Sequence, residues 1–273
     1  MSAAPAVQVS YSRRGPLGVI RLERPDALNA LTLGMIAEVE RLARGAEADP
    51  EVIALCITGA GRGFCAGIDM EVLADYASGG RPQQGGPLGE RPRNPALFSF
   101  LLDISKPVIA AINGPAAGGG FVLAMMCDLR FMAEEAALTT VFTKRGLIAE
   151  HGTSWLLPRM IGLSRALDLL WSARRIDGAE AYRLGFADRL VPGADLLATV
   201  EAYAADLAAH TSPRALAVIK SEVHRHLETG FEDAARDAEA LMAVALAHPD
   251  ATEGATSFIE RRPPRFAPWT GEE

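Results

Sequence analysis

The chain has 273 residues, 49% of them hydrophobic and 22% charged, which is the composition of an ordinary globular protein and excludes a disordered or fibrous chain. Its length suits one large domain, or a core with a smaller appendage. Lys and Arg number 27 against 34 Asp and Glu, and the net charge of -7 argues against general binding to nucleic acids or anionic membranes.

The three cysteines, Cys56, Cys65 and Cys127, lie in apolar or glycine-rich segments, which argues against a disulfide framework. No Cys/His pair has zinc spacing, and the first residues lack the apolar core of a signal peptide. Residues 107–127 are uncharged over a length that would span a bilayer, but Asn113-Gly114-Pro115 breaks them into a strand, a turn and a helix. We therefore expect a cytoplasmic protein that neither holds a metal nor enters a membrane.

Short aliphatic segments bounded by Gly, Pro or Asp predict strands, and apolar residues at helical spacing predict helices. In chain order we expect strands at 7–11, 17–22, 52–58, 108–113 and 129–133, and helices at 32–46, 70–77, 96–104 and 119–126. Thr32 is placed to cap the first of these helices. The alternation of strands and helices predicts an α/β fold.

The last third of the sequence is almost entirely helical. We expect helices at 155–160, 164–172, 178–184, 194–210, 213–227 and 231–247, and a last turn at 255–261. Residues 78–94 are instead of low complexity, with too few apolar side chains to offset the entropy of ordering them. Two interpretations of this loop stay open, a mobile surface insertion and a lid over a substrate.

Two glycine-rich turns each follow a strand and open toward a helix, at residues 58–69 and 113–120. Phe64 stands where a dinucleotide-binding turn needs glycine, and Phe121 stands where a phosphate-binding loop needs lysine. The first N–H groups of a helix have no partner within that helix, and donors from two turns could form an oxyanion hole. The alternative is that the glycines only allow close packing of strand and helix.

Five motifs together resemble the crotonase superfamily, the enoyl-CoA hydratase/isomerase family, in order and spacing. They are RPDALNAL at 24–31, FCAGID at 64–69, NGPAAGGG at 113–120, AMMCD at 124–128 and FIERRPPRF at 258–266. The resemblance implies a spiral of repeated ββα units over about residues 1–200 and a helical oligomerisation region at 201–273. It also implies a homotrimer or a dimer of trimers.

The resemblance further implies an acyl-CoA thioester substrate, with CoA as part of the substrate and no separate cofactor. By motif match the oxyanion-hole donors are the backbone N–H groups of Ile68 and Gly119, and Ala66, Gly67 and Gly118 belong to the same substrate-binding turns. Such a hole stabilises an enolate, so the shared chemistry is proton transfer at the α-carbon.

Hydratases of this family carry two glutamates, and both positions differ in this sequence. The first falls on Val122 and the second on Phe142, neither of which can transfer a proton. Glu150 instead matches the position at which the double-bond isomerases of the family place a single acid, and one carboxylate is enough to move a proton between two carbons. The alternative is that Glu150 is only an acid near the start of the following helix. His151 beside it could orient Glu150 or contact the substrate.

Cations must compensate the phosphates of CoA in a chain of net charge -7. By family position the candidates are Arg24, Arg62, Lys220 and Arg261, with Arg262 beside the last. For each of them a surface charge without a ligand is an equally good interpretation.

Other side chains near these motifs are assigned by their neighbours in the sequence. The acyl chain is expected against Leu73, Phe98 or Trp155. Asp69, part of the substrate-binding turn, is expected to hydrogen-bond that turn or to cap the next helix. His224 and His226 are two residues apart on a helix and are not expected to share a metal.

Three hypotheses follow for the function. The first is an isomerase that converts a 3-enoyl-CoA into the conjugated 2-enoyl-CoA, with Glu150 as the single acid/base. The second is hydration of a 2-enoyl-CoA to a 3-hydroxyacyl-CoA. The third, from another class, is a family member that binds CoA esters without turnover.

Overall fold

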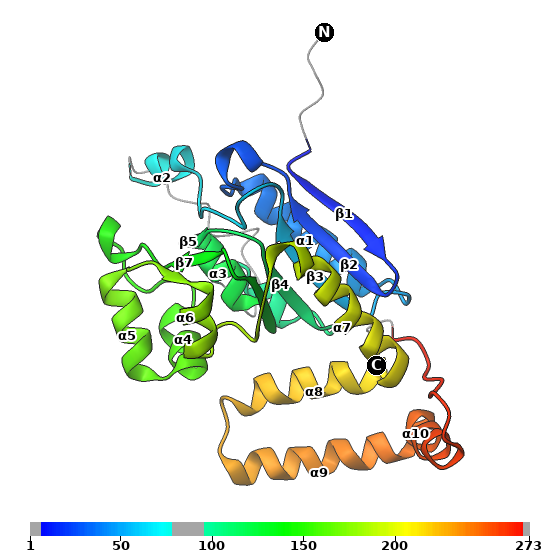
Figure 1. Ribbon diagram of the computed structural model, residues 1–273. Helices are drawn as coiled ribbons and strands as arrows, with labels where there is room; N and C mark the ends of the chain where they lie inside the picture. The colour runs from blue at the N-terminus through cyan, green and yellow to red at the C-terminus, as the bar shows by residue number, and fades with distance from the viewer. Residues whose placement is uncertain (1–6, 78–95, 270–273) are drawn as a thin grey trace, which may run out of the picture.

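The structure is a computed structural model that describes residues 7–77 and 96–269 (Figure 1). The predicted insertion or lid at 78–94 lies outside these residues. Within them, every helix is too short or too polar to reach across a bilayer.

The main sheet of the described residues has six strands in the order β1-β2-β3-β4-β6-β9. An antiparallel hairpin forms its edge, and the remaining strands run parallel to β2. The strands are β1 (Val9–Arg14), β2 (Leu17–Leu22), β3 (Ala54–Gly59), β4 (Val108–Ile112), β6 (Leu129–Ala133) and β9 (Arg189–Val191). Every residue of β3 and β4 is buried, so both faces of the sheet are covered there, and this explains their continuous aliphatic sequences.

A second, three-stranded sheet consists of β5 (Ala116–Ala117), β7 (Ala137–Thr139) and β8 (Ile176–Asp177). The chain runs from β4 to β5 and then into helix α3 (Gly119–Met126), and it repeats the step from β6 to β7. Each repeat therefore puts one strand into each sheet. This path confirms the predicted α/β class and has the strand–strand–helix repeat that the resemblance implies.

The helices before the C-terminal region largely follow the prediction. They are α1 (Leu33–Glu47), α2 (Met70–Ala77), α3, α4 (Thr153–Ile161), α5 (Leu163–Ser172) and α6 (Gly178–Leu184). Thr32 caps α1, because its hydroxyl oxygen accepts the Met35 N–H at 3.2 Å.

The helix predicted at 96–104 is wrong. Only Ser99–Leu102 form a short 3₁₀ turn, because the buried Phe98 has a left-handed backbone with φ of 60° that no α-helix accommodates. Strands β5, β7, β8 and β9 were absent from the prediction, since segments of two or three residues carry no periodic pattern.

The C-terminal region contains α7 (Leu196–His210), α8 (Pro213–His226), α9 (Phe231–Ala247) and α10 (Pro249–Glu260). Helix α7 packs against β2, β4 and β6 with Val200 and Ala204 buried, so the predicted boundary at residue 200 falls inside a helix of the core. The last three helices lie beyond the main sheet (Figure 1), and α9 has no buried residue.

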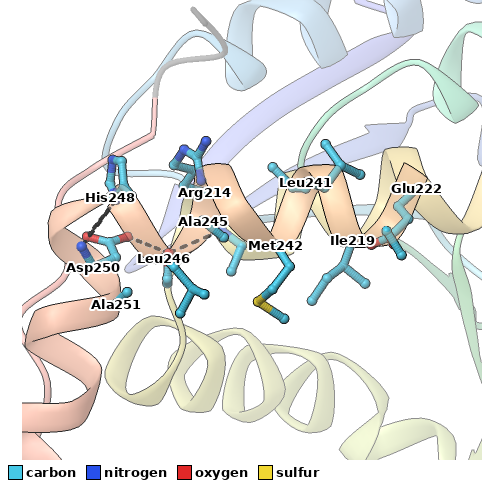
Figure 2. A pocket seen from close by; sticks show the side chains of 14 residues that line it. Arg214, Ile219, Glu222, Leu241, Met242, Ala245, Leu246, His248, Asp250 and Ala251 are labelled. Atoms are coloured by element: carbon cyan, nitrogen blue, oxygen red, sulfur yellow. Dashed lines mark hydrogen bonds and ion pairs between the residues drawn. The ribbon is translucent and has the colours of Figure 1, made fainter. Parts of the chain in front are cut away.

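A groove of about 360 Å³ separates α8 from α9 and the start of α10. Figure 2 shows its largely apolar lining, with Ile219 on α8 and Leu241, Met242 and Leu246 on α9. In the chain as described, Ile219, Met242 and Leu246 are more than half exposed. The helical tail therefore presents an apolar surface that its own residues leave uncovered.

A largely buried ion pair attaches α8 to the core. The Lys220 ammonium lies 2.7 Å from the carboxylate of Asp128, which directly follows Cys127, the C-cap of α3. The ammonium also donates to the carbonyl oxygens of Leu101 and Lys106. The same Asp128 carboxylate accepts the Val108 N–H at the start of β4. One carboxylate thus joins α8, the end of α3 and the first residue of a central strand.

We expect Asp128→Asn to lower the free energy of unfolding by about 3 kcal/mol, because it leaves the buried Lys220 charge without a counter-ion. Urea-induced unfolding measures this change. The matched control is Asp237→Asn, which removes an exposed partner of Arg225 and should cost less than about 1 kcal/mol. Equal effects of the two substitutions would contradict the anchoring role of Asp128.

Candidate active site

The segment after β3 is held beside α1 by a single parallel bridge between Leu31 and Ile68. The Leu31 N–H donates to the Gly67 carbonyl oxygen at 2.8 Å, and the Asp69 N–H donates to the Leu31 carbonyl oxygen at 3.0 Å. In such a bridge the residue between the two bonded neighbours directs its own N–H away from the partner strand. The Ile68 N–H is therefore left free on the other side of the segment.

Gly119 is the first residue of α3, and its N–H belongs to the unpaired first turn of that helix. A methyl group on Gly119 would lie 3.3 Å from the Ile68 Cδ1 and 3.4 Å from the Ile68 nitrogen. Among the residues that the structure describes, neither the Ile68 N–H nor the Gly119 N–H has an acceptor. The two predicted donors, the N–H groups of Ile68 and Gly119, therefore lie close together at the start of α3.

The neighbouring glycines divide into two groups. A methyl group on Gly120 would lie 2.1 Å from the Cys65 carbonyl oxygen, and one on Gly114 would lie 2.1 Å from that of Arg62, so these two glycines serve close backbone packing. Gly67 has φ of +100° and Gly118 has φ of +49°, conformations that glycine adopts most readily. Gly114 and Gly120 therefore allow close backbone packing, and Gly67 and Gly118 provide backbone conformations that favour glycine in the same two turns.

Ala66 completes the first turn through its N–H, which donates to the Leu28 carbonyl oxygen at 2.9 Å. Cys65 lies next to it and is buried, and burial raises the pKa of its thiol to about 12. The thiol is therefore protonated at neutral pH and is not a nucleophile.

The two positions that the resemblance assigns to the glutamates of hydratases are apolar core positions in this chain. The Val122 side chain, on α3, is fully buried, and the Phe142 side chain is 2% exposed. Neither position contributes a titratable group.

Glu150 lies just before α4, and its side chain is 40% exposed. Its backbone carbonyl oxygen accepts the Thr153 N–H at 3.0 Å, but its carboxylate makes no hydrogen bond to the first turn of α4 among the described residues. Glu150 therefore does not cap α4 by a hydrogen bond, but it lies two residues before the N-cap Gly152, where an acid can interact with the helix dipole as the alternative requires. Leu147 and Ile148, which precede Glu150 in the chain, are 40% and 80% exposed.

His151 contacts the Glu150 carboxylate, with its Nε2 at 3.7 Å from the Glu150 Oε1. Its Nδ1 accepts the Leu97 N–H at 3.3 Å. Burial lowers the pKa of His151, and the charge of Glu150 raises it by a smaller amount. Leu97 was missed by the sequence analysis, because a backbone N–H located 54 residues away leaves no signal in a motif.

Arg24 and Asp69 form an ion pair at 2.8 Å. Arg24 also donates to the Ala30 carbonyl oxygen, while Asp69 accepts the Glu71 N–H at the start of α2. The hydrogen bond from Arg24, followed by that from Glu71, lowers the pKa of Asp69. The structure thus confirms that Asp69 caps the next helix, and it gives Arg24 a partner within the fold.

The other predicted cations differ in whether their charge is already paired within the fold. Arg62 and Arg261 are exposed, and the described residues offer them no side-chain partner. Arg262 binds Glu253 through both of its terminal nitrogens. The ammonium of Lys220 has all three hydrogens engaged inside the fold, which corrects its assignment to a phosphate.

The candidate acyl-chain residues also lie in different environments. Phe98 is 1% exposed, whereas Trp155 is half-buried with the Arg159 guanidinium 4.0 Å from its ring centroid. The side chain of Leu73 lies outside the described residues. Of the two side chains that the structure describes, Trp155 is therefore the accessible one.

The two histidines on α8 have different partners. His224 lies 3.4 Å from Asp128 and His226 lies 3.0 Å from Asp237. The described part of the chain contains no group of three metal-ligating side chains.

Comparison with known proteins identifies the relatives of this chain. Residues 13–268 match the model of the family described as Enoyl-CoA hydratase/isomerase. A probable enoyl-CoA hydratase of Mycobacterium tuberculosis is 35% identical over 92% of this chain and 94% of its own length. The 1,2-epoxyphenylacetyl-CoA isomerase of Escherichia coli is 34% identical over 94% of this chain and 97% of its own.

The solved structure of an enoyl-CoA hydratase from Bacillus anthracis superposes with a TM-score of 0.85. It is 27% identical and covers 97% of this chain and all of its own. The similarity therefore extends over the spiral core and the C-terminal helices together.

Proposed function

Because the chain belongs to the enoyl-CoA hydratase/isomerase family and is an enzyme of the crotonase type, we propose that it moves the double bond of an enoyl-CoA from the 3,4 to the 2,3 position. Glu150 is the single acid/base of this reaction. The observation that carries the proposal is the distribution of acids. The Glu150 side chain is 40% exposed and can meet a substrate, while Val122 and Phe142 are buried and apolar.

The free N–H groups of Ile68 and Gly119 would bind the carbonyl oxygen of the thioester. When Glu150 takes a proton from C2, the electron pair of that C–H bond moves onto this oxygen, and the two N–H groups stabilise the negative charge. As the pair returns, C2=C3 forms, and the former C3=C4 pair takes the proton from Glu150 at C4. The proton returns to the substrate, Glu150 ends as a carboxylate, and no electrons are gained or lost. The reaction therefore needs no further reactant.

Hydration of a 2-enoyl-CoA is the second candidate, because the Mycobacterium tuberculosis relative is named for that reaction. Two groups perform hydration most readily, one to activate water and one to protonate C2. In this chain Glu150 would have to do both, since the alternative positions are apolar. This requirement is the reason that we rank isomerisation first.

Arg62 and Arg261 are the cations that we assign to the phosphates of CoA. Both are exposed, and neither has a side-chain partner among the described residues, so their charge is free to meet an anionic ligand. Trp155 offers the acyl group an apolar face.

We expect Glu150→Gln to lower turnover of 3-hexenoyl-CoA by about a hundredfold, because the amide has the shape of the carboxylate but cannot accept the proton. The assay follows conjugation and hydration separately. The control is Glu134→Gln, an exposed glutamate in the turn after β6, which should keep the parental rate. A fully active Glu150→Gln would remove Glu150 from the mechanism, and hydration without conjugation would select the second candidate.

We expect Gly119→Pro to lower kcat by roughly a hundred- to a thousandfold, since proline has no N–H and deletes one of the two donors. Proline is accepted at the first position of a helix, so the variant is expected to fold. Circular dichroism and a thermal melt check the fold. A folded variant with the parental kcat would reject the oxyanion hole.

We infer that the chain assembles into a homotrimer or a dimer of trimers through its C-terminal helices. Large apolar side chains are exposed there, among them Phe231, Leu246, Phe258 and Ile259, and single chains seldom leave so many uncovered on neighbouring helices. Sedimentation velocity is expected to give a mass three or six times that of one chain. The mass of a single chain would contradict the assembly.

A further inference from the structure

His151 joins two segments that are far apart in the sequence. Its backbone has φ of 53°, in the left-handed region, and its side chain is 33% exposed. On one side its Nδ1 accepts the N–H of Leu97, and on the other side its Nε2 faces Glu150. The imidazole therefore lies between a fixed backbone donor and the carboxylate of the candidate site.

The bond from Leu97 determines where the ring carries its proton. A backbone N–H can donate only to a ring nitrogen that has a free lone pair, so Nδ1 is unprotonated. A neutral imidazole then has its proton on Nε2, the nitrogen that lies 3.7 Å from the Glu150 Oε1. His151 is thus oriented as an uncharged donor toward the carboxylate.

Resting on the proposed role of Glu150, we propose that His151 is a positioning residue. Leu97 anchors its ring, and its Nε2–H, which faces the Oε1 of Glu150 at 3.7 Å, closes to a hydrogen bond with that oxygen when the substrate is bound. The other carboxylate oxygen, Oε2, is then the atom that takes the proton from C2 and returns it at C4. A carboxylate held at one oxygen keeps the same orientation for both transfers.

The geometry suits this role better than that of a second acid/base. A histidine that accepts a backbone N–H at Nδ1 cannot take up a proton there without losing the bond. Among the described residues, Glu150 is also the one titratable side chain that the structure places in contact with the ring. His151 therefore acts on the reaction only through Glu150.

Two substitutions separate the anchor from the donor. In His151→Asn the side-chain oxygen can replace Nδ1 as the acceptor for Leu97, and asparagine tolerates a positive φ, but no donor reaches Glu150. In His151→Gln the amide N–H can extend to the position of Nε2. We expect kcat for 3-hexenoyl-CoA to fall about tenfold in His151→Asn, the scale of one hydrogen bond to a charged group, with KM within about twofold. His151→Gln is expected to restore most of the loss.

The split between kcat and KM distinguishes positioning from a structural role. A carboxylate that is less well oriented lowers kcat and leaves substrate binding unchanged, and His151→Gln should restore the rate. A merely structural defect would raise KM as well, and His151→Gln would not restore it.

The double variant tests whether His151 acts through Glu150. In the Glu150→Gln background, His151→Asn is expected to cause no further loss, because the carboxylate that it positions is already gone. A further tenfold loss in that background, or a parental kcat in His151→Asn alone, would overturn the proposal. If His151→Asn did not fold, His151→Gln would decide, with parental kinetics supporting the proposal and a tenfold loss overturning it.

The same set of variants keeps this proposal apart from the proposed function. A fully active Glu150→Gln would reject the role of Glu150, and with it that of His151. A slow Glu150→Gln beside a fully active His151→Asn would reject only the positioning role.

Discussion

The parallel bridge between Leu31 and Ile68 fixes the direction of the Ile68 N–H, and the proposed site depends on that direction. Leu31 bonds to the two neighbours of Ile68, Gly67 and Asp69, and so turns the N–H of Ile68 away from Leu31. A second bridge, between Cys65 and Ala116, holds the same loop against the strand that leads into α3. Backbone pairing, and not the chemistry of any side chain, therefore places the Ile68 nitrogen close to the start of α3.

Several Arg and Lys side chains are paired within the fold, so the proposed site relies on backbone N–H groups and not on these cations. Several cations are used within the fold, with Arg24 bound to Asp69 and Lys220 bound to Asp128. Arg130 likewise bonds to Asp188 and to three backbone carbonyl oxygens. A negatively charged enolate would then be stabilised by N–H groups that are already oriented, and such donors need little reorganisation during the reaction.

Strained backbone collects around the candidate carboxylate. His151 and Phe98 are neighbours of the Leu97 contact, and both have left-handed conformations although neither is glycine. Each such residue costs on the order of 1 kcal/mol or more, so the surroundings must hold it in place. Burial of the Phe98 ring and the bond between Leu97 and His151 supply that restraint. The position of Glu150 is thus set by contacts that extend to a separate segment of the chain.

The sequence by itself determined the α/β class, the bounds of α3, α6 and α9, the cap at Thr32, and the two turns that carry Ile68 and Gly119. These features are local, since periodicity, capping residues and glycine positions lie within one element. Only the tertiary structure decided that Lys220 is an internal anchor, that residues 96–104 do not form an α-helix, and that Leu97 holds His151. Each of these depends on groups tens of residues apart that come into contact only when the sheets have formed. Local sequence patterns do not predict such contacts.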